Sequence, residues 1–209
     1  MTITIFGATG QVGQQVVKQA LVKGFTVKAF GRNVYSTDFL KHDNLHLLQG
    51  ALFDETDVKK AIEGSNAVLS VIGGAFDGTD KSRSLGMKNI VKQMEATGVT
   101  RIVALGGMGV LPDEEGKLLM EAETYPQEFL PVGREHLKAY EVLKSSHLQW
   151  TFVCAPDLVN ADATGSFTVE EEKNPATSKY KINTGDLALF MLNELEKNQF
   201  LQKRVGISN

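Results

Sequence analysis

The sequence contains little of what marks secreted, membrane or nucleic-acid-binding proteins. It has one cysteine, Cys154, so no disulfide can form within the chain, as is typical of proteins in a reducing compartment. No apolar stretch approaches the roughly 20 residues of a membrane span, and Met1 leads almost directly into an apolar segment, which leaves no room for a signal peptide. The formal net charge is −3 without a basic cluster, so neither nucleic acid nor an anionic membrane is an expected partner. These absences predict a cytoplasmic protein.

Length and composition indicate one folded domain. A chain of 209 residues can bury one sizeable core but is short for two ordinary α/β domains. The hydrophobic content of 42% and the charged content of 22% are globular values, and no repeat, low-complexity tract or linker divides the chain. We therefore predict a single domain over residues 1–209.

The most informative segment opens the chain. Apolar residues at 2–6 precede Gly7, Gly10 and Gly13, and a helical pattern of apolar residues begins among the glycines. This order predicts a strand, a tight turn and a helix. Glycines at such a turn let the backbone approach a pyrophosphate, and the helix N-terminus directs N–H groups at the anion. The alternative is an ordinary strand-to-helix turn, but three glycines in this context favour a dinucleotide site.

The motif Gly7-Ala8-Thr9-Gly10-x-x-Gly13 resembles the glycine signature of extended and atypical short-chain dehydrogenases/reductases. Over nearly its whole length the chain is also similar to their NmrA-like, NAD(P)H-binding branch, which includes biliverdin reductase B and bacterial proteins named NADH-flavin reductases. This resemblance implies a Rossmann-type fold and a nicotinamide cofactor, and it leaves the substrate open. The residues of this turn that we expect against the cofactor are Gly7, Thr9, Gly10, Gln11, Val12 and Gly13.

Two further turns are expected to contact the cofactor. The strand predicted over residues 25–30 is followed by Arg32. NAD-preferring sites usually carry an acid at this strand end, whereas an arginine can bind the 2′-phosphate of NADP. We therefore predict NADPH as the cofactor, with a solvent-exposed arginine as the alternative. Gly73 and Gly74 end the strand predicted over residues 67–72, and the resemblance places them beside the cofactor; a simple turn is the alternative.

The next predicted strand, residues 101–105, leads to the expected acceptor pocket at Gly107 and Met108. Short-chain reductases commonly place a serine or threonine at this turn, and the resemblance aligns such a serine with Gly107. Glycine has no hydroxyl, so the usual hydrogen-bond donor to a substrate carbonyl is missing, although backbone N–H groups can substitute in part. The pair is instead expected to form a smooth wall for a flat acceptor.

Two irregular segments are expected on the substrate side. Residues 110–131 contain prolines and several large apolar side chains, which favours a lid or wall over the substrate; a packing arm or dimer contact is the alternative. Residues 157–182 form the second segment and begin with Asp157, a predicted pocket residue. The biliverdin reductase B pattern has a histidine at this position, so bilin specificity is not carried over.

The helix expected from Pro131 onward carries two candidate catalytic residues. His136 falls in its early turns, where an imidazole can steer or protonate a bound acceptor; a surface histidine is the alternative. Tyr140 and Lys144 match the Tyr-x-x-x-Lys of short-chain reductases. Tyr140 lies about nine residues into the helix, roughly 13 Å from its start, whereas ligands of this fold bind where such helices begin. We therefore interpret the tyrosine motif as coincidental. No other histidine shows ligand spacing with His136, so no metal is predicted.

Alternating strands and helices predict an α/β fold, a doubly wound parallel sheet of Rossmann type with small C-terminal substrate-side elements. The leading hypothesis is an NADPH-dependent oxidoreductase that transfers hydride to a small planar acceptor such as a flavin or a quinone, with FMN or FAD as a substrate or a bound group. The alternative is a non-catalytic NADP(H)-binding redox sensor that acts through protein partners. A sugar-nucleotide epimerase is disfavoured because it needs the tyrosine–lysine pair and a larger C-terminal region. The protein is expected as a monomer or a homodimer.

Overall fold

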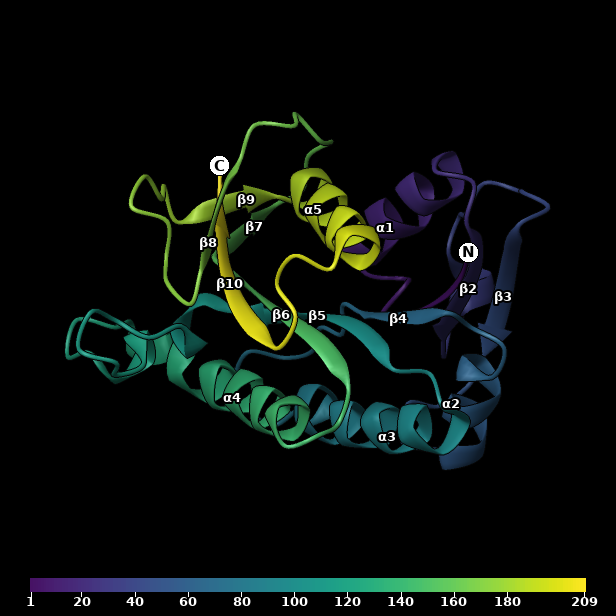
Figure 1. Ribbon diagram of the computed structural model, residues 1–209, viewed down its shortest axis with the longest axis horizontal. Helices are drawn as coiled ribbons and strands as arrows, with labels where there is room; N and C mark the ends of the chain where they lie inside the picture. The colour runs from purple at the N-terminus through teal and green to yellow at the C-terminus, as the bar shows by residue number, and fades with distance from the viewer.

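Strands and helices alternate through most of the chain (Figure 1). The structure, a computed structural model, describes all 209 residues. The strands are β1 (Thr2–Phe6), β2 (Thr26–Gly31), β3 (Leu45–Gln49), β4 (Ala67–Ser70), β5 (Arg101–Gly107), β6 (Gln149–Ala155), β7 (Asp157–Val159), β8 (Thr168–Glu171), β9 (Lys181–Asn183) and β10 (Lys203–Ser208). The α-helices are α1 (Gln11–Val22), α2 (Glu55–Ile62), α3 (Ser82–Thr97), α4 (Leu130–Lys144) and α5 (Thr184–Lys197).

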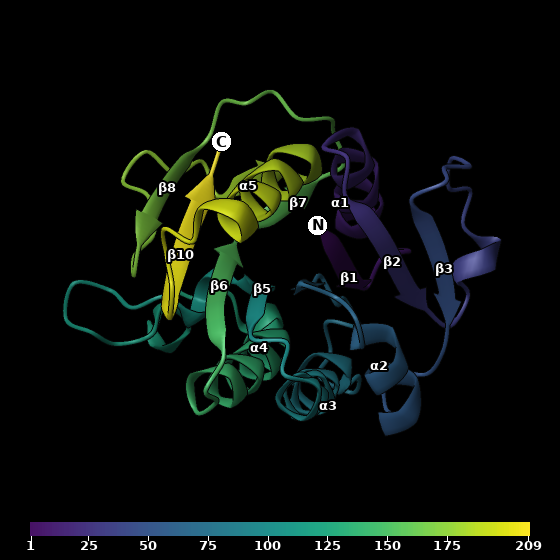
Figure 2. The same ribbon diagram turned by 45° about the vertical axis from the view of Figure 1, so that its right-hand side comes forward.

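Eight strands form one sheet in the order β3-β2-β1-β4-β5-β6-β10-β8. All neighbours are parallel except β8, which runs antiparallel to β10, and Figure 2 shows β3 and β8 at opposite edges. The predicted doubly wound, mostly parallel sheet is therefore confirmed. The chain moves from β1 to one edge through β2 and β3, and then returns to the other side of β1 through β4. Such a reversal opens a crevice at the carboxyl ends of the strands, where α/β folds bind ligands.

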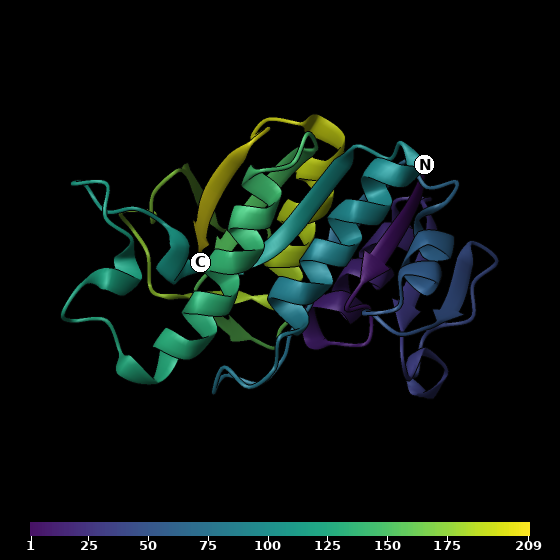
Figure 3. The ribbon, with the colours of Figure 1, turned by 90° about the horizontal axis from the view of Figure 1, so that it is seen from below.

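Helices cover both faces of this sheet. Helices α1 and α5 lie on one face, and α2, α3 and α4 lie side by side on the other (Figures 1 and 3). Each layer has its own buried core, of 27 residues beneath α1 and α5 and of 23 residues beneath the other three helices. A strand covered on both faces has no face toward solvent, which explains why all four residues of β4, Ser70 included, are buried.

Some boundaries differ from the sequence-based expectations. Strand β4 ends at Ser70, two residues before the predicted end of residues 67–72, because the chain there leaves the ladder to form the turn at Gly73. Helix α4 begins at Leu130, so Pro131 is its second residue. Within the segment 157–182, one strand was expected at residues 166–170 and corresponds to β8, whereas β7 and the part of β9 in this segment were not expected. None of the helices combines the length and hydrophobicity that crossing a lipid bilayer requires.

Candidate cofactor and acceptor site

A cleft of about 470 Å³ lies at the carboxyl ends of β1, β2 and β4. Its floor is the turn between β1 and α1, and residues 50–53, after β3, form its far wall. The crevice expected from the reversal of strand order is therefore present. The predicted cofactor residues that line it are Gly7, Thr9, Gly10, Gln11, Val12, Arg32, Gly73 and Gly74.

The three glycines of this turn meet two different needs. Gly7 has φ +83°, and a Cβ there would lie 2.5 Å from the carbonyl oxygen of Val71. A Cβ on Gly13 would lie 2.1 Å from the carbonyl oxygen of Gly7, so both positions exclude a side chain for packing reasons. Gly13 does not itself line the cleft. Gly10 meets only that same oxygen, at 3.4 Å, so its missing side chain leaves space for a ligand instead.

Helix α1 presents an uncapped N-terminus to the cleft. Gly10, its N-cap residue, provides no side-chain hydrogen bond, and the first turn contains no acidic residue. The N–H groups of a helix's first turn have no partner within the helix, and the helix dipole adds positive potential. Exposed N–H groups beside a glycine without a Cβ fit the pyrophosphate of a dinucleotide.

Arg32 lines the same cleft just beyond the end of β2. Its backbone carbonyl oxygen accepts a hydrogen bond from Gln49 Nε2 at 2.9 Å, which fixes the turn. Its side chain is exposed and forms no salt bridge within the chain. A guanidinium without an internal carboxylate partner can bind a phosphate on two N–H groups.

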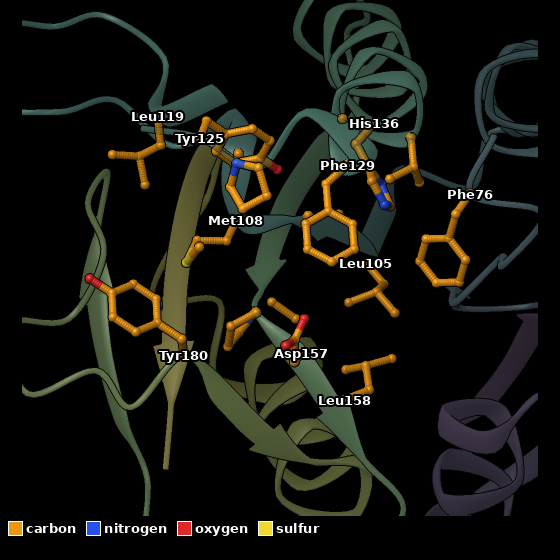
Figure 4. A pocket seen from close by; sticks show the side chains of 18 of the residues that line it. Phe76, Leu105, Met108, Leu119, Tyr125, Phe129, His136, Asp157, Leu158 and Tyr180 are labelled. Carbon is orange, nitrogen blue, oxygen red and sulfur yellow. The ribbon is translucent and has the colours of Figure 1, made fainter. Parts of the chain in front are cut away.

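A larger cavity of about 930 Å³ adjoins the cleft. The predicted pocket residues Gly107, Met108 and Asp157 line it, as does His136 (Figure 4). Figure 4 shows Phe76 at one end of this acceptor cavity and Tyr180 at the other. Both hollows share part of one wall. The residues that line both are Gln11, Ile72, Gly73, Leu105 and Leu158.

The imidazole of His136 occupies the space that a side chain at residue 107 would need. A Cβ on Gly107 would lie 2.8 Å from His136 Cδ2 and 3.3 Å from Nε2. Burial and the positive charge of Arg83 lower the pKa of His136 to about 3, so the ring is neutral at pH 7. His136 therefore lies in the cavity wall as a neutral hydrogen-bonding group, which favours steering of the acceptor over protonation.

Tyr140 lines neither hollow. It is 8% exposed, and its ring contacts Trp150 edge-on with centroids 5.7 Å apart and Phe152 at 5.6 Å. The guanidinium of Arg204 lies 4.9 Å from the ring centroid, and the ammonium of Lys144 lies 5.9 Å from it. Tyr140 and Lys144 thus form a packing pair, and the catalytic candidacy of Tyr140 has no support from its position.

The sequence analysis predicted a lid or wall over residues 110–131 but gave no hydrogen-bonding role to any residue of this segment. The segment 110–131 contributes Leu119, Tyr125 and Phe129 to its wall. The Tyr125 hydroxyl lies near Gly109, where a Cβ would approach it to 2.6 Å. Burial and the negative charge of Asp157 raise the pKa of Tyr125, so this phenol stays protonated and can donate a hydrogen bond. The prolines and large apolar side chains of the segment were the signal for a wall, but they did not indicate this hydroxyl.

Arg83 of α3 was also missed. It lines the acceptor cavity and is only 7% exposed. Its guanidinium donates to the carbonyl oxygens of Gly74 and Ala75, both at 3.1 Å, and so holds the turn that follows β4. No pattern in the sequence points to it, because a charged residue on a helix usually faces solvent.

Comparisons with known proteins agree with this geometry. A family model described as NAD(P)H-binding matches residues 7–198. The uncharacterized protein YwnB of Bacillus subtilis is 26% identical over an alignment of 217 positions, which covers 99% of this chain and 98% of that protein. Photosystem II assembly factor Ycf39 of Guillardia theta is 24% identical over an alignment of 213 positions, which covers 99% of this chain and 64% of that protein.

Solved structures show the same fold. A Streptococcus pneumoniae protein that has been named provisionally as an NADH-flavin reductase superposes with a TM-score of 0.86 at 25% identity, covering 100% of this chain and 99% of that one. The family match contains the uncapped glycine turn, the arginine after β2 and every residue of both hollows except Phe6. The chain therefore belongs to the NAD(P)H-binding family of Rossmann-fold proteins.

Proposed function

We propose that this protein is an NADPH-dependent oxidoreductase that transfers hydride to a flat acceptor such as a flavin or a quinone. The observation that supports this most is the wall shared by the cofactor cleft and the acceptor cavity, at Gly73 and Leu105. A dinucleotide with its pyrophosphate at the α1 N-terminus would have its nicotinamide end at this junction, and there it would supply the hydride. The Streptococcus pneumoniae relative, with its provisional flavin reductase name, supports the same reaction class.

A flat acceptor fits the character of the cavity. Gly107 and Met108 form one wall, and the aromatic rings of Phe76, Tyr125 and Phe129 border the same space. Such surfaces suit a planar ring, and a few polar groups then fix its orientation. The neutral imidazole of His136 and the phenol of Tyr125 can hydrogen-bond a ring carbonyl. A proton from solvent completes the reduction, so the serine that short-chain reductases carry at residue 107 is not required.

Anaerobic oxidation of NADPH by the purified protein tests this proposal. FMN, FAD, riboflavin and a small quinone are offered in parallel, with NADH as the paired control. We expect saturable turnover, faster with NADPH, and a ranking of acceptors that reflects the cavity. The Gly10→Val variant, whose fold should persist, serves as the inactive control. Tight NADPH binding without turnover for any acceptor would contradict the proposal.

A non-catalytic redox sensor is the second candidate. It is favoured by the missing hydroxyl at Gly107 and by the position of Tyr140 in the core. The relative named as an assembly factor, Ycf39, is consistent with a role through protein partners. A sensor predicts dissociation constants for NADPH and NADP⁺ that differ strongly, and a partner protein that binds only one of the two complexes. Equal affinities, together with turnover, would exclude it.

A further inference from the structure

We infer that Arg83 forms an oxyanion-binding site in the acceptor cavity, which stabilises the negative charge that hydride transfer leaves on a conjugated ring oxygen. This inference rests on the proposed function and narrows its substrate class. The acceptors it selects are planar molecules whose reduced form is a delocalised oxyanion, such as a quinone or the N1–C2=O side of a flavin.

The guanidinium of Arg83 has more donors than the protein uses. Arginine carries five N–H groups, and Arg83 uses two of them, toward the carbonyl oxygens of Gly74 and Ala75. Its Nε is buried without any partner. Because the two hydrogen bonds within the chain use one N–H on each terminal nitrogen, each of these nitrogens keeps a second N–H for an acceptor.

The second buried arginine of this chain shows the contrast. Arg101 is 6% exposed, and its NH2 donates to Glu194 Oε1 at 2.9 Å, so its charge is neutralised on contact. Its NH1 also donates to the carbonyl oxygen of Gln149 and to the Thr151 hydroxyl, both at 2.9 Å. Arg101 Nε is buried without a partner, as Arg83 Nε is, so the difference between the two arginines is the carboxylate that pairs with Arg101. Arg83 has similar burial but no carboxylate in hydrogen-bond contact.

The acids nearest to Arg83 are engaged elsewhere. Asp80 Oδ1 accepts from the Ser82 N–H at 2.7 Å. The carboxylate of Glu135 accepts from Lys81 Nζ at 3.2 Å, from Lys138 Nζ at 3.0 Å and from the Ser84 hydroxyl. Both acids act on Arg83 only through space, where they oppose the lowering of its pKa by burial. The arginine therefore remains a cation with free donors.

Arg83 is placed to act on a molecule in the larger cavity and not on the cofactor. Arg83 lines the larger cavity, whereas its neighbours Asp80 and Ser82 line the cofactor cleft. The cavity lining contains one other charged group, the carboxylate of Asp157, so Arg83 is its one cation at neutral pH. The ring of Phe76 lies 5.9 Å from the guanidinium carbon and can hold the guanidinium in place.

The positive charge of Arg83 would offset the negative charge that the reaction places on the acceptor. Hydride adds two electrons and one proton to the acceptor ring, a C–H or N–H bond forms, and the carbonyl electron pair moves onto the conjugated oxygen. The cofactor becomes NADP⁺, and solvent later supplies the second proton. A fixed cation beside that oxygen is already oriented before the charge develops, so it favours the transition state over the neutral substrate.

Equilibrium binding of an oxyanion and its neutral counterpart tests the site without turnover. The probes are 4-hydroxycoumarin, a planar enolate at neutral pH, and coumarin, the same bicyclic ring without that oxygen. Both are titrated calorimetrically into the protein saturated with NADP⁺. We expect the enolate to bind about tenfold more tightly, as one charged hydrogen bond supplies. The Arg83→Met variant should bind both probes equally.

Two further variants make the result specific. Arg134→Gln removes an exposed arginine from α4 that lines neither hollow, and should keep the tenfold preference. Arg83→Lys keeps the charge without the planar fork, and should keep part of the preference; it also replaces Arg83→Met if that variant fails to fold. Equal binding of the two probes by the unmodified protein would overturn the inference.

The outcomes also separate this inference from the proposed function. If Arg83→Met weakens NADPH binding but keeps the enolate preference, Arg83 only holds the turn at Gly74, and the inference is overturned. If the unmodified protein reduces flavins or quinones and Arg83→Met still prefers the enolate, the oxyanion site is wrong and the proposed function stands. If Arg83→Met loses the enolate preference but the unmodified protein reduces no acceptor, the anion site is supported and the reductase function is wrong.

Discussion

Residue 107 determines which polar group faces the larger cavity. A serine there would provide a hydroxyl, but its Cβ would fall 2.8 Å from the His136 ring. The His136 imidazole can therefore occupy its position only because residue 107 has no side chain. Its chemical consequence is that a neutral N–H group replaces a hydroxyl in the wall of the cavity.

The first prediction tests this coupling. Gly107→Ser should lower the free energy of unfolding by about 1–3 kcal/mol, because the new Cβ overlaps the His136 ring. His136→Ala should relieve the overlap, so the double variant should be more stable than the sum of the two single changes implies. Denaturant unfolding of all four proteins gives the coupling energy. Strictly additive effects would show that the two residues do not compete for space.

Arg32 provides the second prediction. Arg32→Gln should weaken NADPH binding by about 1.5–3 kcal/mol, because a charged hydrogen bond to the 2′-phosphate is lost. NADH lacks that phosphate, so its dissociation constant should change little. Fluorescence titration of both cofactors provides the measurement, with Arg134→Gln as the control. An equal loss for NADH would remove the assignment of Arg32 to the 2′-phosphate.

The half-buried imidazole of His136 leads to the third prediction, on stability in acid. In the unfolded chain a histidine has a pKa of about 6.5, whereas His136 in the fold has a pKa of about 3. Between these values the unfolded state binds more protons, so this residue's contribution to stability is present above pH 6.5 and falls as the pH drops toward 3. His136→Asn should therefore lose less stability than the unmodified protein between pH 7 and 4. Identical losses would mean that His136 titrates normally.

At the scale of elements, the turn between β1 and α1 carries the cofactor site. A Cβ at Gly10 would lie 3.4 Å from the carbonyl oxygen of Gly7, whereas a Cβ at Gly13 would lie only 2.1 Å from that oxygen. The fourth prediction follows from this difference. Gly10→Val should fold with nearly unchanged thermal stability and lose NADPH binding, while Gly13→Val should be strongly destabilised. Thermal unfolding and cofactor titration of both variants check this; a Gly10→Val protein that still binds NADPH would contradict it.

The main elements could be predicted from the sequence because their signals are local. A strand, glycines and a helical pattern follow one another at residues 2–22, and such periodicity needs no knowledge of the rest of the chain. The pairing of β7 with β9 could not be predicted, because each strand has only three residues and 21 residues separate them. Distance along α4 correctly separated His136, which lines the cavity, from Tyr140, which does not.

The rest of the site depends on contacts between distant segments. Arg83 became part of the cavity because the helix that carries it turns that residue inward against the loop after β4. The Tyr125 hydroxyl is placed by Gly109, in another turn. A single sequence contains no local signal for either contact, because each depends on how separate elements pack together.

On the scale of the whole molecule, the site joins two halves of the sheet. The turn after β1 and the residue after β2 form the cofactor cleft, and the ends of β5 and β6 form the acceptor cavity. The helical layers on the two faces hold these halves together through separate cores. Neither hollow belongs to one layer alone, so the site depends on the assembly of the complete sheet.

The wall common to both hollows would determine the order of binding and release in the proposed reaction. A nicotinamide ring bound at Gly73 and Leu105 would itself become one side of the acceptor's binding surface. The acceptor would then enter after the dinucleotide and depart before it, in an ordered ternary-complex mechanism. Double-reciprocal plots of the initial rate at several acceptor concentrations should therefore intersect. Parallel lines would instead indicate that the oxidised dinucleotide leaves before the acceptor arrives.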